Sequence, residues 1–196
     1  MHKAGFISIL GYPNVGKSTL VNSIIGENLM PVSPKAQTTR QRVLGIYNDE
    51  NTQIIFSDLS GWLTNPQYEL HKAMLHDIES AFEDADILIY MHDLTDKRDD
   101  NQLIDIVAKY SQPKIVVLNK ADLVDEKTFS IKEKKFKEKF SNVDIIAVSA
   151  LTGYNVDKLL EIIKTLLPEH PPYYDKDILS DRYLRYFASE IIREQI

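Results

Sequence analysis

Hydrophobic and polar residues follow two different rhythms along the chain. Short apolar runs predict buried strands, and longer stretches with an apolar residue every three or four positions predict helices. The predicted strands are Phe6–Leu10, Val43–Tyr47, Gln53–Phe56, Ile87–Met91, Ile115–Leu118 and Ile145–Val148. The predicted helices are Lys17–Ile25, Pro66–Phe82, Gln102–Tyr110, Lys127–Phe140 and Val156–Leu167.

The order of these elements predicts the architecture. The second and third predicted strands are separated only by the polar stretch NDENT (residues 48–52), which suits an antiparallel hairpin. The later strands alternate with helices, and such alternation is typical of parallel strands with helices on both faces of the sheet. We therefore predict an α/β fold with a mostly parallel six-stranded sheet and one antiparallel strand.

The character of the chain changes after the last of these helices. The segment LLPEHPPYYDKD contains three prolines within five residues, which predicts a stiff linker. Beyond it, Leu184, Phe187 and Ile191 recur at helical spacing. We predict a main domain over residues 1–168, a linker over 169–180, and the first helix of a second, truncated domain over 181–196. A helix docked back on the main domain is the alternative.

The composition removes some classes of function. The chain has no cysteine, which excludes disulfides and thiol-based metal sites or nucleophiles. Its formal net charge of -6 gives no overall attraction for nucleic acid, so RNA binding would need a local patch or another domain. We recognise no signal peptide, and no apolar run approaches the ~20 residues that span a bilayer.

A phosphate-binding loop is predicted between the first strand and the first helix. The stretch GYPNVGKS (residues 11–18) matches G-x-x-x-x-G-K-[ST] in the strand–helix context that this motif requires. Its N–H groups and the helix N-terminus should surround the β-phosphate, while Lys17 reaches the β- and γ-phosphates and Ser18 binds Mg²⁺. The predicted phosphate-binding residues of this loop are Gly11, Asn14, Val15, Gly16, Lys17, Ser18 and Thr19.

A guanine-binding site is predicted from two loops that follow later strands. The first is NKAD, in which the Asp122 carboxylate can accept hydrogen bonds from guanine N1–H and N2–H, donors that adenine lacks. Lys120 can lay its alkyl stem over the base, and Asn119 can tie this loop to the phosphate loop. The second is SAL, where a backbone N–H near Ala150 would meet guanine O6. The predicted guanine-binding residues are Asn119, Lys120, Asp122, Ser149, Ala150 and Leu151.

Two further segments predict nucleotide-dependent switches. In AQTTR (residues 36–40), Thr39 is the predicted ligand of Mg²⁺, with Thr38 as the alternative. In DLSGW, Asp58 should hold Mg²⁺ through a water, and the N–H of Gly61 should bond the γ-phosphate. Both contacts require the terminal phosphate, so its loss would release the two segments.

The position after Gly61 bears on catalysis. Many nucleotide switches have a glutamine there that aligns the attacking water, but this chain has Trp62, whose indole cannot do so. Because phosphoryl transfer depends mainly on positioning and charge stabilisation, a K⁺ held with the help of Asn14 is one substitute. Arg40 or Arg42, acting as an arginine finger within the chain, is another. The predicted catalytic residues are Asn14 (through K⁺), Lys17 and Thr39.

Taken together, these motifs resemble the Era-type family of translation-factor-class P-loop GTPases. The resemblance rests on GYPNVGKSTLVN, SPKAQTTRQR, NKAD, SAL and, after the linker, LSDRYLRYFASEIIRE. It implies the P-loop GTPase fold and slow hydrolysis of GTP to GDP and phosphate with Mg²⁺. One departure is Ser60, where the family usually has a proline; its loss removes a fixed φ from the second switch.

The same resemblance implies partners that lie beyond these residues. Era-type proteins carry a C-terminal KH domain that binds 16S ribosomal RNA during small ribosomal subunit assembly, and this chain would contain only its first helix. The resemblance further implies a cytoplasmic protein with peripheral contact at the inner membrane and no obligate oligomer. A GTP-gated binding module with negligible turnover is one alternative. Another is a GTPase of the tRNA-modification or tandem-domain type.

Overall fold

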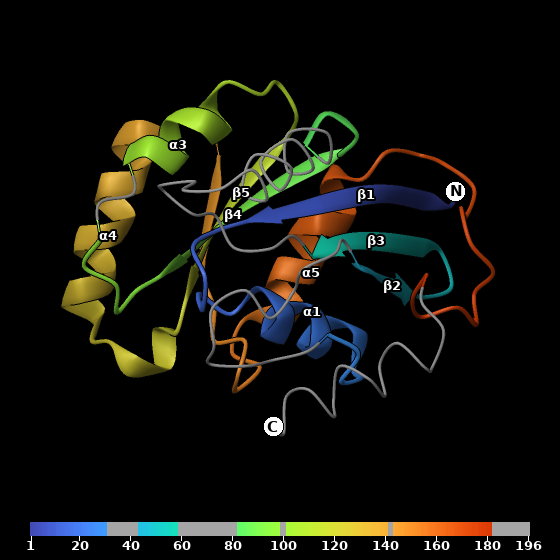
Figure 1. Cartoon of the computed structure of the whole chain (residues 1–196), viewed down its shortest axis with the longest axis horizontal. Coiled ribbons are helices and arrows are strands. Elements are labelled where there is room, and N and C mark those ends of the chain that lie inside the picture. The colour runs from blue at the N-terminus through green and yellow to red at the C-terminus, as the bar shows by residue number, and fades with distance from the viewer. Residues whose placement is uncertain (31–42, 59–81, 99–100, 141–142, 182–196) are drawn as a thin grey trace, which may run out of the picture.

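The structure, a computed structural model, describes residues 1–30, 43–58, 82–98, 101–140 and 143–181 (Figure 1). Its strands are β1 (Lys3–Leu10), β2 (Val43–Asn48), β3 (Thr52–Asp58), β4 (Ile87–Asp93), β5 (Lys114–Asn119) and β6 (Asp144–Ala147). Its helices are α1 (Lys17–Ile25), α3 (Asn101–Ala108), α4 (Glu126–Lys139) and α5 (Val156–Leu166), with the short 3-10 helix η1 (Ala121–Leu123).

The strands form one sheet in the order β2-β3-β1-β4-β5-β6. β2 runs antiparallel to β3, and every other neighbouring pair is parallel. On one face α1 packs beside α5. On the other face α4 packs through Phe136, whose ring centroid lies 5.7 Å from that of Tyr90 in β4. The predicted mixed sheet with helices on both faces is therefore confirmed.

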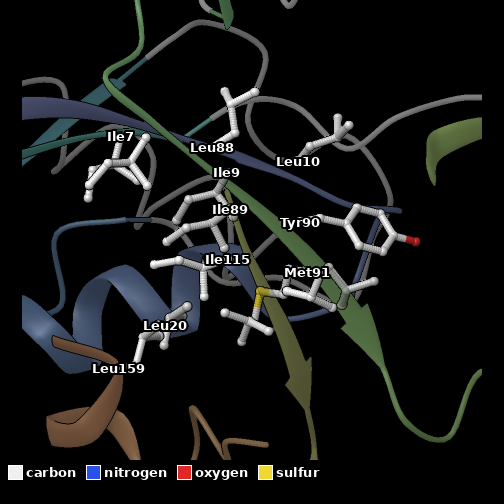
Figure 2. Close-up of a cluster of buried hydrophobic side chains, with 14 of the residues drawn as sticks. Ile7, Ile9, Leu10, Leu20, Leu88, Ile89, Tyr90, Met91, Ile115 and Leu159 are labelled. Carbon is white, nitrogen blue, oxygen red and sulfur yellow. The ribbon is translucent and has the colours of Figure 1, made fainter. Parts of the chain in front are cut away.

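The hydrophobic core surrounds the central strands β1 and β4. Every residue of β4 is buried. Because successive side chains of a strand point to opposite faces, Leu88 and Tyr90 lie on one side of the sheet, and Ile89 lies on the other with Leu20 of α1 and Leu159 of α5 (Figure 2). Burial of each such side chain contributes ~1.5–3 kcal/mol. The core thus fixes the strands whose ends carry the polar loops described below.

The predicted element boundaries are confirmed to within a few residues. Helix α1 spans Lys17–Ile25 as predicted, because Gly16 and Gly26 on either side of it adopt left-handed backbone conformations, with φ of 101° and 82°. Strand β1 begins at Lys3, earlier than its apolar run. Most of the predicted helix Pro66–Phe82 lies outside the described residues.

The carboxyl end of β1 lies where the strand order reverses. After β1 the chain builds β2 and β3 on one side of it, and then adds β4 on the other side. In open, mostly parallel sheets, ligands bind in the crevice outside the strand ends at such a reversal. The topology therefore points to the loop after Leu10 as the centre of a binding site.

The predicted linker (residues 169–180) lies against the outer edge of β2. The N–H of Ile46 donates to the carbonyl of Leu179 over 2.8 Å. The hydroxyl of Ser180 donates to the carbonyl of Leu44 over 2.6 Å. The linker therefore extends the hydrogen bonding of the sheet by a short antiparallel contact beyond β2.

A buried glutamine fastens the middle of this linker. Gln53 in β3 has no exposed surface. Its Nε2 donates to Asn48 Oδ1 and to the carbonyl of Tyr174, both over 2.8 Å. Its Oε1 accepts hydrogen bonds from the N–H groups of Tyr173 (2.6 Å) and Tyr174 (3.0 Å). One amide thus makes four hydrogen bonds, one within the β2–β3 hairpin and three to the linker.

Residues 182–196, which make up most of the predicted first helix of a second domain (181–196), lie outside the described residues. The domain boundaries predicted at residues 168 and 180 stay a prediction. In the part of the chain that the structure describes, no helix has both the length and the apolar composition to cross a membrane.

Candidate nucleotide-binding site

The loops that follow β1, β4, β5 and β6 meet at one edge of the sheet. This arrangement follows from parallel pairing, which brings the carboxyl ends of these strands together. Backbone hydrogen bonds join the loops to one another. The N–H of Leu94 donates to the carbonyl of Asn119, and the N–H of Ala121 donates to the carbonyl of Val148, both over 3.0 Å. The predicted phosphate and guanine loops are therefore parts of one surface.

The phosphate loop connects β1 directly to the first turn of α1. Asn14 and Gly16 have positive φ angles of 65° and 101°, which curl the loop so that successive N–H groups can point to one side. No side chain caps the N-terminus of α1, and its first turn has no acidic residue. The N-terminus of this helix therefore favours an anion, because its dipole and first N–H groups are not countered by an acidic side chain in the first turn.

Both glycines of this motif are required by close approach of neighbouring strands. A Cβ on Gly11 would lie 2.5 Å from the carbonyl oxygen of Met91 in β4. A Cβ on Gly16 would collide with Nδ2 of Asn119 at the end of β5. The glycine spacing read from the sequence thus reflects the contact of this loop with two strand ends.

Replacing Gly16 by alanine is expected to weaken guanine-nucleotide binding by at least about tenfold, because the new Cβ displaces Asn119 in addition to straining a left-handed residue. Gly26→Ala is the matched control: its φ is 82°, but among the described residues no atom beyond its own chain neighbours lies within 4 Å of the added Cβ. That control should lose ~1–2 kcal/mol of stability and keep its nucleotide affinity. Calorimetric titration and thermal unfolding measure both effects; equal nucleotide affinity in the two variants would contradict the expected role of Gly16.

Lys17 is the buried cation of the phosphate loop. The residue is 7% exposed, and its ammonium donates to the carbonyls of Gly11 (3.4 Å) and Tyr12 (3.3 Å). Ser18 and Thr19 follow in the first turn of α1 and are half-buried. The predicted phosphate ligands are therefore grouped around the N-terminus of this helix.

Asn119 connects three parts of the site. Its side chain is buried, with Nδ2 donating to the carbonyl of Val15 over 2.7 Å and Oδ1 accepting from the N–H of Ala150 over 3.0 Å. The predicted tie between Asn119 and the phosphate loop is confirmed. The contact with Ala150 was not expected, and it occupies the N–H of that residue. Within the described residues, the N–H of Leu151 makes no hydrogen bond, so it is a donor open to an acceptor on a ligand.

Two residues of the NKAD loop differ sharply in their surroundings. Asp122 lies in η1, is exposed, and makes no hydrogen bond or ion pair within the described residues. Lys120 has a left-handed backbone with φ of 63°, and its ammonium lies 2.5 Å from Oδ2 of Asp93. The carboxylate of Asp122 is thus open to a ligand, while the lysine is already held by the protein.

Asp93 is a residue of the site that the sequence analysis missed. It ends β4, opposite Asn119 in the strand register, and is 7% exposed. Burial acts to raise the pKa of its carboxyl, but the ammonium of Lys120 and the two donors of Thr95 outweigh burial, so the pKa lies below its ordinary value of 3.8. The one feature of the sequence that could have indicated Asp93 is its place as a carboxylate shortly after the mostly apolar run of the predicted strand.

The SAL segment forms a tight turn at the rim of the site. The N–H of Gly153 donates to the carbonyl of Ser149 over 2.9 Å, and the N–H of Thr152 donates to Ser149 Oγ over 3.2 Å. Leu151 stands at the tip of this turn and is 82% exposed. The turn therefore presents an apolar side chain and backbone N–H groups beside the NKAD loop.

Most of the switch residues lie outside the described residues, namely Thr38, Thr39, Arg40, Arg42, Ser60, Gly61 and Trp62. Asp58 is described by its backbone, which ends β3 in register with Ile9 near the carboxyl end of β1. Among the described residues, no group of three or more His, Cys, Asp or Glu could hold a metal ion. Mg²⁺ usually takes one or two protein oxygens together with substrate phosphates, and the Ser18 hydroxyl with Asp58 fits that donor chemistry.

Comparison with known proteins identifies the class of this fold and site. Residues 6–120 match the sequence profile of the family described as 50S ribosome-binding GTPase. This match covers more than half of the chain, so the chain belongs to that family of P-loop GTPases.

Within this class, the chain is of the Era type. It is 38% identical over 197 residues to the GTPase Era of Staphylococcus epidermidis, a match that covers 100% of this chain and 66% of the relative. The chain therefore spans slightly less than two thirds of the length of that protein.

Two solved structures have the same fold over nearly the whole chain. One is Era in complex with MgGDPNP and nucleotides 1506–1542 of 16S ribosomal RNA, with a TM-score of 0.92, 37% identity, and coverage of 100% of this chain and 67% of that one. The other is a variant of Aquifex aeolicus Era bound to GDP and AlF4⁻, with a TM-score of 0.90, 36% identity, and coverage of 98% and 66%. The predicted Era-type resemblance and P-loop GTPase fold are thus confirmed.

Proposed function

We propose that this chain is the nucleotide-binding part of a switch that hydrolyses GTP to GDP and phosphate, with slow turnover on its own. The observation that carries the proposal is the position of Asn119. Its amide bonds the phosphate loop at Val15 and the SAL turn at Ala150, next to the open carboxylate of Asp122. One rigid group therefore sets the distance between a phosphate-binding loop and a guanine-binding loop.

Each part of the nucleotide has a proposed partner in this arrangement. The N–H groups of the phosphate loop and α1 receive the phosphates, with Lys17 and, from the second switch, Gly61 contacting the terminal one. Asp122 accepts the hydrogen bonds of guanine N1–H and N2–H, and Leu151 lies at the rim beside O6. These assignments use donors and acceptors whose chemistry matches the guanine edge.

The metal ligands proposed for the site are Ser18, Thr39 and, through a water, Asp58. When bound, Mg²⁺ neutralises charge that develops on the β- and γ-phosphates. The MgGDPNP in the Era complex supports this proposal for the present chain.

A K⁺ ion is proposed to replace the missing water-aligning glutamine in stabilising charge. Asn14 is exposed at the bend of the phosphate loop, where its side-chain oxygen can reach a cation beside the nucleotide. A cation at this place would act on the transition state as an arginine finger does. The charge then comes from solution, and the protein supplies only its position.

The proposed function predicts that GTP turnover with Mg²⁺ is at least about tenfold faster in K⁺ than in Na⁺, because K⁺ adds charge where the transition state develops it. Asn14→Ala should abolish this difference without a large loss of GTP affinity. Asn51→Ala, an exposed asparagine on the distant β2–β3 hairpin, is the matched control and should keep the K⁺ effect. Single-turnover cleavage of GTP measures the rates. Equal rates in both salts would exclude the K⁺ role, and no cleavage in either would leave a GTP-gated binding module.

The proposed cellular role follows from the Era relatives. The Era complex contains a 16S ribosomal RNA fragment, which supports a role for the GTP state in small ribosomal subunit assembly through a KH domain beyond residues 181–196. GTP cleavage measured with and without small-subunit RNA separates this switch from a GTPase of the tRNA-modification or tandem-domain type. A cytoplasmic location, peripheral contact with the inner membrane, and the lack of an obligate oligomer stay predictions.

A further inference from the structure

Residues 93–98, the last residue of β4 and the loop that follows it, touch both halves of the candidate site. At their start, Asp93 holds the ammonium of Lys120 in the guanine loop. At their end, the guanidinium of Arg98 lies 4.5 Å from the ring centroid of Tyr12 in the phosphate loop. Between them, the carbonyl of Asp96 accepts a hydrogen bond from Lys132 of α4 over 2.6 Å. This loop was not assigned any role by the motifs.

The two oxygens of the Asp93 carboxylate have different partners. Oδ1 accepts hydrogen bonds from the N–H (2.8 Å) and the hydroxyl (2.7 Å) of Thr95. Oδ2 faces the ammonium of Lys120 at 2.5 Å. The first oxygen is therefore fixed by its own loop, which orients the second toward the lysine. The lowered pKa of Asp93 agrees with a carboxylate that is ionised at neutral pH.

Lys120 is held at both ends of its side chain. Its backbone adopts a left-handed conformation that costs about 1–2 kcal/mol in a non-glycine residue, so the direction of its side chain is imposed by the fold. Its ammonium is fixed at Asp93, on the neighbouring strand. The alkyl stem therefore spans from the end of β5 to the end of β4. An unrestrained lysine would lose side-chain entropy when the base binds. Lys120 is already ordered in the unbound protein, so this entropic cost of binding is smaller.

We infer that Asp93 is a positioning residue for the nucleobase, acting through Lys120. It stretches the lysine stem across the sheet edge as a flat apolar surface for the purine face, opposite Leu151. This role rests on the proposed guanine-nucleotide function. Because the stem contacts the ring face and not the exocyclic groups, Asp93 contributes to binding of any purine that Asp122 accepts.

The test is a double-mutant cycle on nucleotide affinity, with GTP and ITP as ligands. Asp93→Asn should weaken both by a similar factor of about 5–20, since a charged hydrogen bond is lost and the stem is released. Lys120→Met should weaken both comparably. In the Lys120→Met background, Asp93→Asn should change affinity by less than about twofold, because coupled residues are not additive. Asp105→Asn, an exposed carboxylate of α3, is the control and should bind as the wild type does.

Thr95→Val provides a second variant should Asp93→Asn fold poorly. Thr95 is exposed, so the change is well tolerated, yet it removes the hydroxyl that orients Oδ1 and should weaken both nucleotides by about 2–5-fold. Wild-type affinity in both Asp93→Asn and Thr95→Val would overturn the inference. An equal loss from Asp93→Asn with and without Lys120 would also overturn it, since a purely structural role gives that result. Failure of the wild type to bind GTP would instead refute the proposed function.

Discussion

Lys17→Ala is expected to weaken binding of MgGTP by at least about 100-fold, since charged hydrogen bonds to phosphate contribute ~1.5–3 kcal/mol each and the ammonium makes more than one. Its burial at 7% exposure, within the curve of the phosphate loop, strengthens these contacts because little water competes for them. Titration of a fluorescent guanine nucleotide measures the affinity. Lys158→Ala, an exposed lysine of α5, is the control and should leave it unchanged.

The folded state needs a separate check in the Lys17 variant. The ammonium donates to the carbonyls of Gly11 and Tyr12, so its removal changes the loop as well as the charge. Lys17→Met keeps most of the side-chain volume and should show the same loss of affinity with a melting temperature close to that of the wild type. Unchanged GTP affinity in both variants would refute the phosphate-loop assignment.

Asp122→Asn is expected to exchange the base preference of the site from guanine to xanthine. In the proposed site the carboxylate accepts from two guanine donors, whereas an amide there would present an N–H that suits the C2 carbonyl of xanthine. A site built for a hydrogen-bond donor rejects a base without it by about 10⁴–10⁵, so GTP affinity should fall by at least about 1,000-fold while XTP becomes a ligand. Competition of GTP, XTP and ATP against a labelled nucleotide measures the exchange.

The surroundings of Asp122 allow its effect on base preference to be measured without a change in the fold. Asp122 is exposed and has no hydrogen bond or ion pair within the described residues, so its replacement disturbs no contact there. Asp105→Asn makes the same chemical change on α3 and should leave the preference for guanine intact. Tight ATP binding by the wild type, or a retained guanine preference in Asp122→Asn, would show that another group reads the base.

The ends of a helix or strand could be predicted from the sequence where neighbouring residues determine them. Helix α1 begins and ends where it was predicted to, because Gly16 and Gly26, which flank it, adopt left-handed backbone conformations. Strand β1 started earlier than expected for a non-local reason. The N–H of Lys3 donates to the carbonyl of Asn51, and the residue bridges Glu169 of the linker, and neither partner is close in sequence. Tertiary pairing extended the strand into polar sequence.

Residues of the site that belong to a sequence motif could be predicted. Residues that reach the site only through the pairing of neighbouring strands could not. Val15 and Asn119 belong to separate motifs, and their expected contact was found. Asp93 belongs to no motif, because its importance arises only when β4 pairs with β5 and brings it beside Lys120. A backbone N–H near Ala150 was predicted to meet guanine O6, and the structure shows that the side chain of Asn119 takes the N–H of Ala150 itself. The sequence alone does not show which acceptor takes a given backbone N–H, because that depends on how the loops pack against one another.

The linker was predicted as a stiff spacer, and its prolines gave no sign of where it would lie. β2 is the outermost strand of its side of the sheet, and outermost strands present unpaired N–H and C=O groups that can pair with another molecule. Residues 179–181 occupy those groups. The N–H of Ile46 donates to the carbonyl of Leu179, the N–H of Leu44 donates to Oδ1 of Asp181, and the carbonyl of Leu44 accepts from the hydroxyl of Ser180. Removing residues 169–181 would expose the unpaired backbone groups of β2 and would leave the buried amide of Gln53 without its partners Tyr173 and Tyr174.

The contacts of the sheet therefore continue past its last described helix, α5, into the linker. A chain cut at residue 168 would keep every motif of the nucleotide site but would lose the cover of β2 and the partners of Gln53, so we expect it to be less stable and to self-associate through that strand edge. We therefore expect the linker to shield the edge of the sheet from other copies of the same molecule.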